Sequence, residues 1–400
     1  METVGGGVAS PGGFRASGIT CGLKKNRAPD LAMVFSDRPA RVAGLYTQNK
    51  IKGNSLKLAM ENAANGTARA VVINSGNANA CNGVAGYSAA QEVCLASASL
   101  IGCRSTEIIF GSTGVIGYPL DMGKLIPGLN KAYCSLSEHG GSDAAGAIMT
   151  TDTFKKEIAV EFELDHGKAR IGGMAKGSGM IHPDMATMIS VLTTDVNIPG
   201  ELLKASLKKA CASTFNRISV DGDTSVCDMA VILANGNGDQ LQIEKNSADH
   251  IKFIKVLTYV CEYLAKNIAR DGEGATKLLE IRCINALTAD DAYKVVSSVA
   301  RSPLVKTAFF GMDANWGRII TAAGYSGAYM DESKTDIYIG GMHFFHDGSS
   351  IDFSEEEALA ILSEKEITVT IDLNTGSYSD RMWTCDFSYD YIKINGSYRT

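Results

Sequence analysis

Long apolar runs and an excess of basic charge are both missing from this chain of 400 residues. No apolar stretch approaches the 18 or so residues of a membrane-spanning helix, and the longest tidy run covers only residues 229–234. Lysine and arginine total 38 against 44 aspartate and glutamate residues, which gives a net charge of −6. No basic run is interleaved with aromatic residues, so we expect neither nucleic acid nor an anionic membrane as a partner.

Several short signals are also missing. The ten cysteines include no Cys-x-x-Cys pair, so we expect no zinc knuckle and no redox pair, only reduced and mostly buried thiols. Residues 1–7 lack the patterns of a secretory signal and of a transit peptide, which favours a cytoplasmic location. No Gly-x-Gly-x-x-Gly fingerprint is present, and we expect no cofactor, although CoA can be bound without that fingerprint.

What the chain does have is enough apolar content for a large core. Hydrophobic residues make up 45% of it, and no repeat, low-complexity tract or Pro/Ser linker divides it into independent domains. Hydrophobic spacing mixes the two kinds of element throughout, which indicates an α/β or α+β fold. We expect strands over 70–73, 158–164, 188–192, 229–234 and 367–373, and helices over 88–101, 251–270 and 289–301 and directly after Pro199-Gly200.

One segment, residues 176–195, carries a reactive arrangement. A flexible Lys-Gly-Ser-Gly stretch and a Pro183 corner lead to Thr187, which opens an apolar run. A threonine hydroxyl pressed against the preceding Ala186 carbonyl can take up that acyl group as an ester, and hydrolysis then leaves Thr187 as a new chain end. Its freed α-amine, with an ordinary pKa of about 7.7–8.0, is a usable general base beside its own hydroxyl nucleophile. Without further context, a loop entering a buried strand explains these residues better.

Eight blocks spread over the chain supply that context. They are residues 72–80, 110–117, 149–153, 176–195, 219–224, 270–276, 311–318 and 395–400. In this order they resemble the glutamate N-acetyltransferase (ornithine acetyltransferase) family of arginine biosynthesis, over nearly the whole chain. One departure is Asp184, where many relatives are expected to have Asn; it lies three residues before the implied cut and bears on the speed of processing.

The resemblance implies a fold, a cut and a reaction. The fold is a layered αββα sandwich, similar to the N-terminal-nucleophile hydrolases but with its own connectivity. Self-cleavage between Ala186 and Thr187 gives chains 1–186 and 187–400, co-folded into one catalytic unit and assembled as two alpha and two beta chains. Acetyl then moves from N2-acetyl-L-ornithine to L-glutamate by a ping-pong path through acetyl-Thr187.

The resemblance also assigns the remaining site residues. Thr113 and Gly114 form the oxyanion hole, and the substrate is contacted by Thr150, Lys176, Thr187, Glu273, Asn395 and Thr400. From the residues alone, a Gly-rich turn at 110–114 can present N–H groups to an anion, and Lys176 can hold a carboxylate or lower the pKa of the Thr187 amine. The plainer alternatives are a tight turn, a solvated surface lysine and, for Glu273, a turn carboxylate in water. Spacing leaves open whether Thr150 or Thr151 touches the ligand.

Other functions fit the same pattern. In a self-processing aminopeptidase or amidase of related architecture, water replaces glutamate as the acceptor. In a non-catalytic binding or scaffold protein, cleavage serves only assembly. Some relatives also accept acetyl-CoA as the donor, and the sequence does not decide whether this chain does.

Other polar clusters are expected to be structural. Residues 74–79, 221–223 and 313–316 are predicted to pin loops rather than line a pocket. His343 and His346 stand three residues apart with no third ligand nearby, and the implied reaction needs no metal, so we expect no metal site. His182 is expected to orient the Pro183 loop rather than act as a base.

Overall fold

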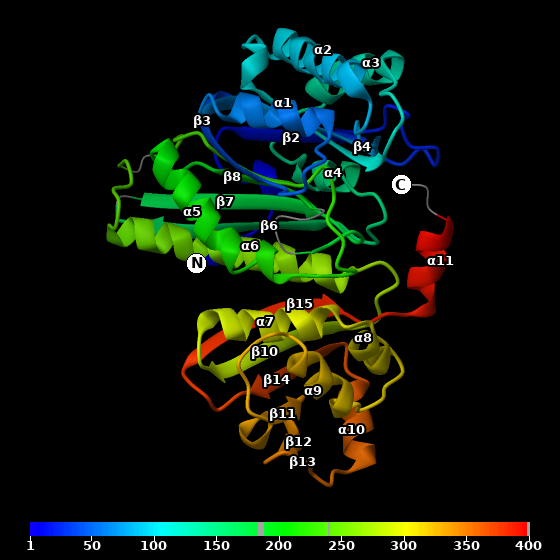
Figure 1. The fold of residues 1–400 in the computed structure, drawn as a ribbon. Coiled ribbons are helices and arrows are strands. Elements are labelled where there is room, and N and C mark those ends of the chain that lie inside the picture. Colours follow the sequence, from blue (N-terminus) through cyan, green and yellow to red (C-terminus); the bar gives the residue numbers. More distant parts are fainter. Residues whose placement is uncertain (166, 183–187, 239–240, 398–400) are drawn as a thin grey trace. The chain divides into compact units, whose positions relative to one another are not determined.

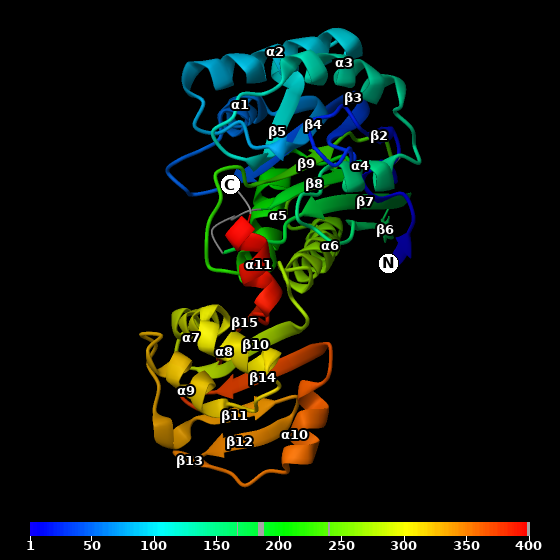
Figure 2. The same cartoon turned by 90° about the vertical axis from the view of Figure 1, so that its right-hand side faces the viewer.

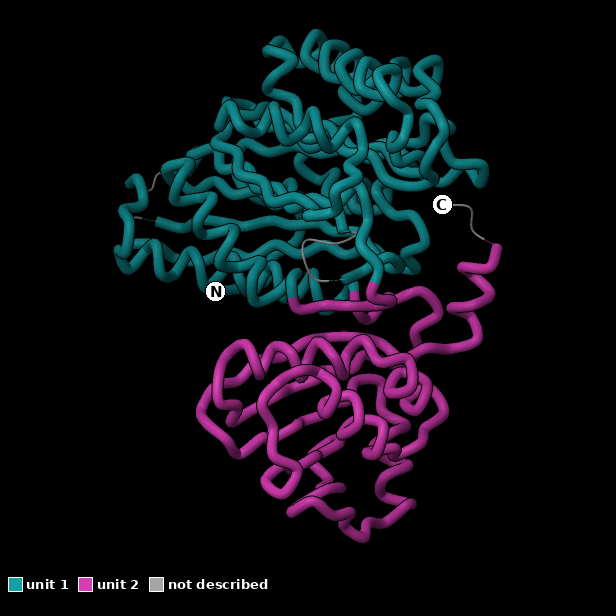
Figure 3. The backbone as a smooth tube through the Cα atoms, in the orientation of Figure 1, with its two compact units in different colours: residues 1–216, 223–268, 399–400 teal, residues 217–222, 269–398 magenta. Residues whose placement is uncertain are grey.

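A computed structural model describes residues 1–165, 167–182, 188–238 and 241–397. Strands and helices alternate along the chain, so the predicted mixed α/β class is confirmed (Figure 1). The described residues form two compact units (Figure 3), the first drawn from 1–216 and 223–268 and the second from 217–222 and 269–397. The division into 1–186 and 187–400 concerns a covalent cut, and it stays a prediction.

The first unit contains a nine-stranded sheet in the order β1-β6-β7-β8-β9-β3-β4-β5, with β2 paired to β3. Its strands are β1 (Glu2–Val4), β2 (Phe14–Ile19), β3 (Leu31–Tyr46), β4 (Thr67–Asn77), β5 (Ile108–Val115), β6 (Lys156–Leu164), β7 (Gly167–Lys176), β8 (Ile189–Thr194) and β9 (Met229–Ala234). Its helices are α1 (Asn54–Ala63), α2 (Gly83–Ile101), α3 (Met122–Cys134), α4 (Gly141–Ala147), α5 (Gly200–Ala212) and α6 (Ala248–Arg270).

The long strand β3 divides this sheet into two halves. Its first part pairs with β2 and β4, and its second part pairs with β9, with a shift in register between Phe35 and Ala40. The two halves face each other across one hydrophobic core, in which Val34 belongs to the same cluster as Val191 and Val231. One chain segment therefore serves both β layers of the unit.

Helices cover the outer faces of the two halves. Met33 and Phe110 face away from the central core and pack with Val93 of α2 and Leu129 of α3. On the other half, a Cβ added at Gly173 of β7 would meet side chains of α6, which shows that this helix lies close against the strand. Figure 2 shows α2 and α3 on the opposite side of these strands from α6. The predicted αββα layering is confirmed.

Most elements of the first unit follow their sequence signals. Helix α5 begins directly after Pro199, as predicted, and α2 ends at Gly102, whose positive φ of 76° closes the helix. The predicted start of α2 at Ser88 is wrong, because the helix begins at Gly83. A contact from outside the helix supports this added first turn: the buried Asn79 side chain donates a hydrogen bond to the carbonyl of Gly86 at 2.9 Å.

The second unit is built on a six-stranded sheet in the order β13-β12-β11-β14-β10-β15. Its strands are β10 (Leu278–Ala286), β11 (Asp336–Ile339), β12 (Met342–His346), β13 (Ser349–Ser350), β14 (Glu366–Asp372) and β15 (Tyr378–Cys385). Its helices are α7 (Ala289–Arg301), α8 (Pro303–Phe310), α9 (Trp316–Gly324), α10 (Glu355–Leu362) and α11 (Tyr389–Ser397). Val295, Ile319 and Leu362 of three helices share one core with the sheet. Asn315 caps α9, which confirms the structural role predicted for residues 313–316.

The described residues bear on two expectations from the composition, which concern membrane-spanning helices and cysteines. Among them, no helix combines the length and the apolar character that a membrane crossing requires. All ten cysteines are free, and six of them are buried, so the prediction of reduced and mostly buried thiols is confirmed.

Close packing between β2 and α4 generates a stability prediction. A Cβ added at Gly18 of β2 would lie 1.9 Å from the carbonyl oxygen of Asp143 in α4, so one of the two elements would have to move. We expect Gly18→Ala to lower the free energy of unfolding by about 1–3 kcal/mol and to lower Tm. Gly200→Ala, at the start of α5 with no atom within 4 Å of the new Cβ, is the control and should leave Tm unchanged or slightly higher. Equal melting temperatures for both variants would contradict this packing.

Candidate active site

The end of strand β5 carries Thr113 and Gly114. Strands β4 and β5 run parallel here, Gly114 pairs with Gly76, and the register becomes irregular at Asn77. Gly114 has a φ of 133°, and an added Cβ would lie 2.4 Å from the carbonyl carbon of Gly76, so only glycine fits. The predicted tight turn at 110–114 is wrong: the chain stays extended to Val115, and its glycines let the backbones approach closely.

The Thr113 side chain is a candidate donor. The residue is 7% exposed, and within the described parts of the chain its hydroxyl has no hydrogen-bond partner. A buried hydroxyl without a partner is costly unless a ligand completes its bonding. The geometry is therefore compatible with donation to a developing oxyanion.

A buried polar network fixes this end of the sheet. The Ser112 hydroxyl donates to Asn74 Oδ1 at 2.6 Å and lies 2.8 Å from the Ser55 hydroxyl, which in turn accepts from Asn79 Nδ2 at 2.9 Å. Asn77 Nδ2 donates to two carbonyl groups of the loop after β5, at 3.1 and 3.0 Å. The prediction that residues 74–79 pin loops is confirmed, and the loop they pin adjoins Thr113 and Gly114.

A second part of the site is organised by Asp152, which the sequence did not single out. Its carboxylate accepts from Lys156 Nζ at 2.7 Å, from the Gly177 N–H at 2.8 Å and from the Thr150 N–H at 2.9 Å. Burial raises the pKa of Asp152, but the ammonium groups of Lys176 and Lys156 and the Gly177 N–H outweigh burial and hold that pKa well below its usual range. The buried carboxylate thus links the Thr150 segment to the end of β7.

Lys176 is the last residue of β7. It is only 4% exposed, so the surface-lysine alternative is wrong. Within the described residues, no acceptor lies at hydrogen-bond distance from its ammonium group, and its positive charge lowers the pKa of Asp152. An ammonium group held this way is suited to a carboxylate ligand.

Lys24 is a further site residue that sequence reasoning missed. Its Cγ would lie 3.1 Å from a Cβ at Gly76, the partner of Gly114, and its Nζ donates to the Pro29 carbonyl at 2.6 Å. Burial lowers the pKa of Lys24 to about 8. The negative charges of Asp30 and Asp152 act to raise this pKa, and the positive charge of Lys176 acts to lower it further. Lys24 thus lies close to Gly76 of β4 and is influenced by the charge of Lys176. No local motif marks it, because only tertiary contacts bring it there.

The proposed nucleophile and cleavage site, Thr187 and Ala186, lie outside the described residues, as do Thr400 and the Pro183 corner assigned to His182. The strand that follows the proposed nucleophile is β8. Ile189 of β8 pairs with Lys176 of β7 and with Met229 of β9, and the Met229 N–H donates to the Met188 carbonyl at 3.0 Å. The chain therefore enters the sheet opposite Lys176, two residues after position 187.

Glu273 and Asn395 meet in the second unit, although 122 positions separate them. Asn395 Nδ2 donates to Glu273 Oε2 at 2.8 Å, and Glu273 is only 8% exposed, so the alternative of a turn carboxylate in water is wrong. A Cβ at Gly274, whose φ is 72°, would lie 2.5 Å from the Tyr391 nitrogen, which explains the glycine beside Glu273. Within the described residues no group bonds to Glu273 Oε1, which is suited to a ligand ammonium group.

The described site residues therefore form two groups, one in each unit. Thr113, Gly114, Thr150 and Lys176 belong to the first unit, and Glu273 and Asn395 to the second. A hydroxyl donor, a buried ammonium and a buried carboxylate are the groups that an acyltransferase acting on amino acids needs. Side chains of these kinds favour an enzyme of the acyltransferase class.

Comparisons with known proteins agree. A family model described as the ArgJ family matches residues 15–400. The chain is 46% identical, over 100% of both chains, to the arginine biosynthesis bifunctional protein ArgJ of Caldanaerobacter subterraneus subsp. tengcongensis and equally to that of Symbiobacterium thermophilum. A crystal structure of ArgJ from Bacillus halodurans has a TM-score of 0.50 and 43% identity, covering 52% of this chain and 97% of that one. The chain belongs to the ArgJ family, which confirms the family and enzyme class predicted from the eight blocks.

The buried charge of Asp152 can be tested by removing it. Both the Asp152 and Lys156 side chains are 0% exposed, so Asp152→Asn leaves the Lys156 ammonium buried without this countercharge. We expect a loss of about 3–5 kcal/mol in the free energy of unfolding near pH 7, measured by denaturant titration. Lys156→Met in the same chain should recover part of it, and strictly additive losses would contradict the pairing.

The pH dependence of this loss has a defined sign. Because the folded-state pKa of Asp152 lies below its unfolded value of about 3.9, its ionised form contributes stability that is present above that value and disappears as the pH falls toward the folded-state pKa. The gap between the parent and Asp152→Asn should shrink below about pH 4. A gap that widened in acid would contradict the assigned charge.

Proposed function

We propose that the chain cleaves itself between Ala186 and Thr187, and that Thr187 then carries acetyl from N2-acetyl-L-ornithine to L-glutamate. The observation that carries this proposal is the register of β7 and β8. It sets the buried Lys176 opposite Ile189, two residues after the proposed nucleophile. A substrate carboxylate binds at Lys176 in this proposal, and its acetyl group reacts with the Thr187 hydroxyl.

The cut proceeds in two balanced steps. The Thr187 hydroxyl oxygen adds to the Ala186 carbonyl carbon and loses its proton. The amide C–N bond then breaks, and the nitrogen takes up that proton and becomes a free amine. Water then hydrolyses the resulting ester, which leaves a carboxylate on Ala186 and both an amine and a hydroxyl on Thr187.

The transfer uses the same two groups. The Thr187 amine accepts the hydroxyl proton as the oxygen attacks the acetyl carbonyl, and the negative charge that develops is stabilised by the Thr113 hydroxyl and the Gly114 backbone. The C–N bond of the substrate breaks, and ornithine leaves with the proton. The amine of glutamate then attacks the acetyl ester, so acetyl passes to it and Thr187 is regenerated.

Each group of site residues has its own proposed binding role. Lys176, in the first unit, binds a carboxylate, and Glu273, in the second unit, binds an ammonium group through Oε1, while Asn395 donates to Oε2. Thr150 and Thr400 complete the contacts in this proposal. We propose no resident cofactor and an assembly of two alpha and two beta chains. The relatives are named bifunctional, which supports a second activity with acetyl-CoA as donor, and an assay with acetyl-CoA and glutamate decides it.

The nucleophile is tested by two substitutions at one position. Thr187→Ala removes the hydroxyl, so the chain should stay uncut and inactive, as seen by gel electrophoresis and by assay of acetyl transfer. Thr187→Ser keeps a hydroxyl and should still cut, with slower turnover. Two fragments from Thr187→Ala would refute the cleavage step, and hydrolysis of acetyl-ornithine by the parent without transfer to glutamate would favour the amidase alternative.

Asn395 is expected to act on the substrate through Glu273. Asn395→Ala removes a hydrogen bond to a charged group, worth about 1.5–3 kcal/mol, and should raise KM for acetyl-ornithine roughly 10- to 150-fold while self-cleavage stays intact. Asn65→Ala, an exposed asparagine in the first unit, is the control and should match the parent. In the Glu273→Gln background the loss from Asn395→Ala should be much smaller, and full additivity would argue against the assigned contact.

A further inference from the structure

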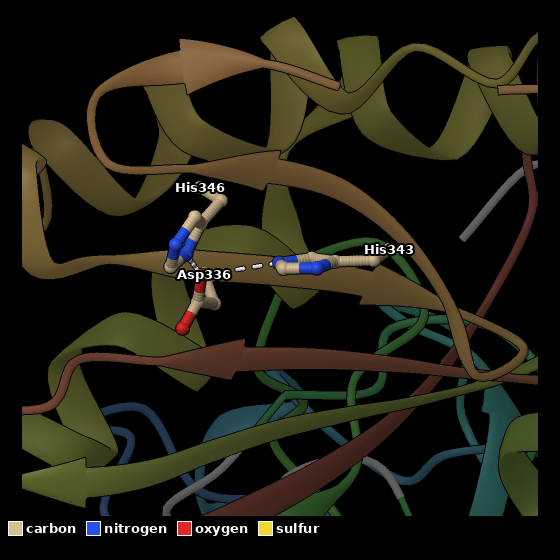
Figure 4. Close-up of side chains that lie close together, drawn as sticks. All are labelled: Asp336, His343 and His346. Atoms are coloured by element: carbon tan, nitrogen blue, oxygen red, sulfur yellow. Dashed lines mark hydrogen bonds and ion pairs between the residues drawn. The ribbon is translucent and has the colours of Figure 1, made fainter. Parts of the chain in front are cut away.

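Three metal-ligating side chains meet at the edge region of the second unit's sheet. Asp336 opens β11, and His343 and His346 lie on the neighbouring strand β12 with their rings directed toward its carboxylate (Figure 4). Asp336 Oδ1 lies 3.0 Å from His343 Nε2 and 2.5 Å from His346 Nδ1. One ligand atom from each residue lies within 4.8 Å of the other two.

An irregularity in the strand pairing brings the two histidines together. In a regular strand, residues three apart point to opposite faces. Here Tyr338 pairs with His343 and Ile337 with Phe345, so β12 has one extra residue, Phe344, between these pairs. Because the extra residue shifts the alternation by one, both histidines point to the same face of the sheet. This is why the spacing in the sequence gave no sign of a site, and why the third ligand was missed.

The bulge also has a packing cause. Phe344 and Phe345 are adjacent in the sequence, yet they are 1% and 3% exposed and both belong to the core of the second unit. Because the core accepts both rings, the bulged conformation is held from the opposite face of the sheet. The positions of the two histidines therefore do not depend on a ligand.

Outer contacts orient each of the three ligands. Asn374 Nδ2 donates to Asp336 Oδ2 at 2.9 Å, which leaves Oδ1 toward the histidines. His346 Nε2 lies 3.4 Å from Asp347 Oδ2, an acceptor that would hold the Nε2 proton when Nδ1 loses its own to a metal. Tyr338 stacks on His343 with ring centroids 4.3 Å apart and planes at 15°. Carboxylate and aromatic partners of this kind commonly support histidine ligands of metals.

We propose that Asp336, His343 and His346 bind one divalent transition-metal ion of the zinc class, with a fourth position open to water. Zinc takes nitrogen and oxygen ligands at about 2.0–2.2 Å, which places tetrahedral ligand atoms roughly 3.4 Å apart. The three atoms need only small shifts to reach that spacing. A mixed imidazole and carboxylate set suits zinc, cobalt or nickel, whereas magnesium and calcium prefer oxygen alone.

The ion can reach this site, and its effect would be structural. The side chains of His343 and His346 are 32% and 53% exposed, so an ion need not cross the core. Bound there, it would join β11 to β12 near the end of the sheet. The cluster includes none of the residues assigned to acetyl transfer, so its test is independent of the proposed function.

The experiment uses the untagged full chain, freed of metal with a chelator and titrated with Zn²⁺ in a calorimeter. We expect one ion per chain, a higher Tm with zinc, and visible absorption of a low-coordinate site when Co²⁺ is used instead. His343→Asn and Asp336→Asn should abolish all three effects. Asp347→Asn removes only an outer contact and should weaken binding roughly 10- to 100-fold.

His139→Asn is the matched control, because His139 is exposed and lies in the first unit. It should bind zinc as the parent does. Equal binding by the parent and by His343→Asn would overturn the proposal. Should the ligand variants fail to fold, side-chain nitrogen NMR of the six histidines in the parent decides it. Zinc must then shift the signals of His343 and His346, and unmoved signals would mean that Asp336 only accepts hydrogen bonds from them.

Discussion

The candidate site depends on one buried charge. Asp152 is ionised although its side chain is shielded from water, because Lys156 and Lys176 supply positive charge and the Gly177 N–H supplies a hydrogen bond. Through these partners it fixes three segments: the Thr150 stretch, the start of β6 and the end of β7. Without the carboxylate, the buried Lys156 and Lys176 would lose the negative charge that Asp152 supplies, and the three segments would lose the group that joins them.

The sheet of the first unit connects these segments to β5, the strand that carries Thr113 and Gly114. Ile189 pairs with both Lys176 and Met229, and the Met229 methyl group lies where a side chain at Gly111 of β5 would have to go. Backbone pairing and the Met229 side chain thus connect the Lys176 end of β7 to β5, the strand that carries Thr113 and Gly114. Residues positioned by such contacts have little freedom to move. The proposed stabilisation of an oxyanion requires donors that are fixed in this way.

Local signals in the sequence predicted the elements well and the contacts poorly. Helix α7 has the predicted bounds, and β9 matches its apolar run, because each has clear caps or a clear period. The predicted start of α2 and the predicted turn at residues 110–114 were wrong, since contacts from outside each segment decide both. Motifs nominated Lys176, Glu273 and Asn395, but Lys24, Asp152 and Asp336 gave no local sign. Their roles come from tertiary contacts and, for Asp336, from a bulge that no pattern in the sequence reveals.

The central claim is that one residue supplies both a hydroxyl and an amine at a new chain end. Intact-mass measurement of the purified active protein, before and after addition of acetyl-ornithine, tests it most directly. The account predicts two polypeptides, the larger beginning at Thr187, with one acetyl group appearing on Thr187 of that polypeptide alone. An active enzyme that consists of one uncut chain, or an acetyl group found on another residue, would contradict it.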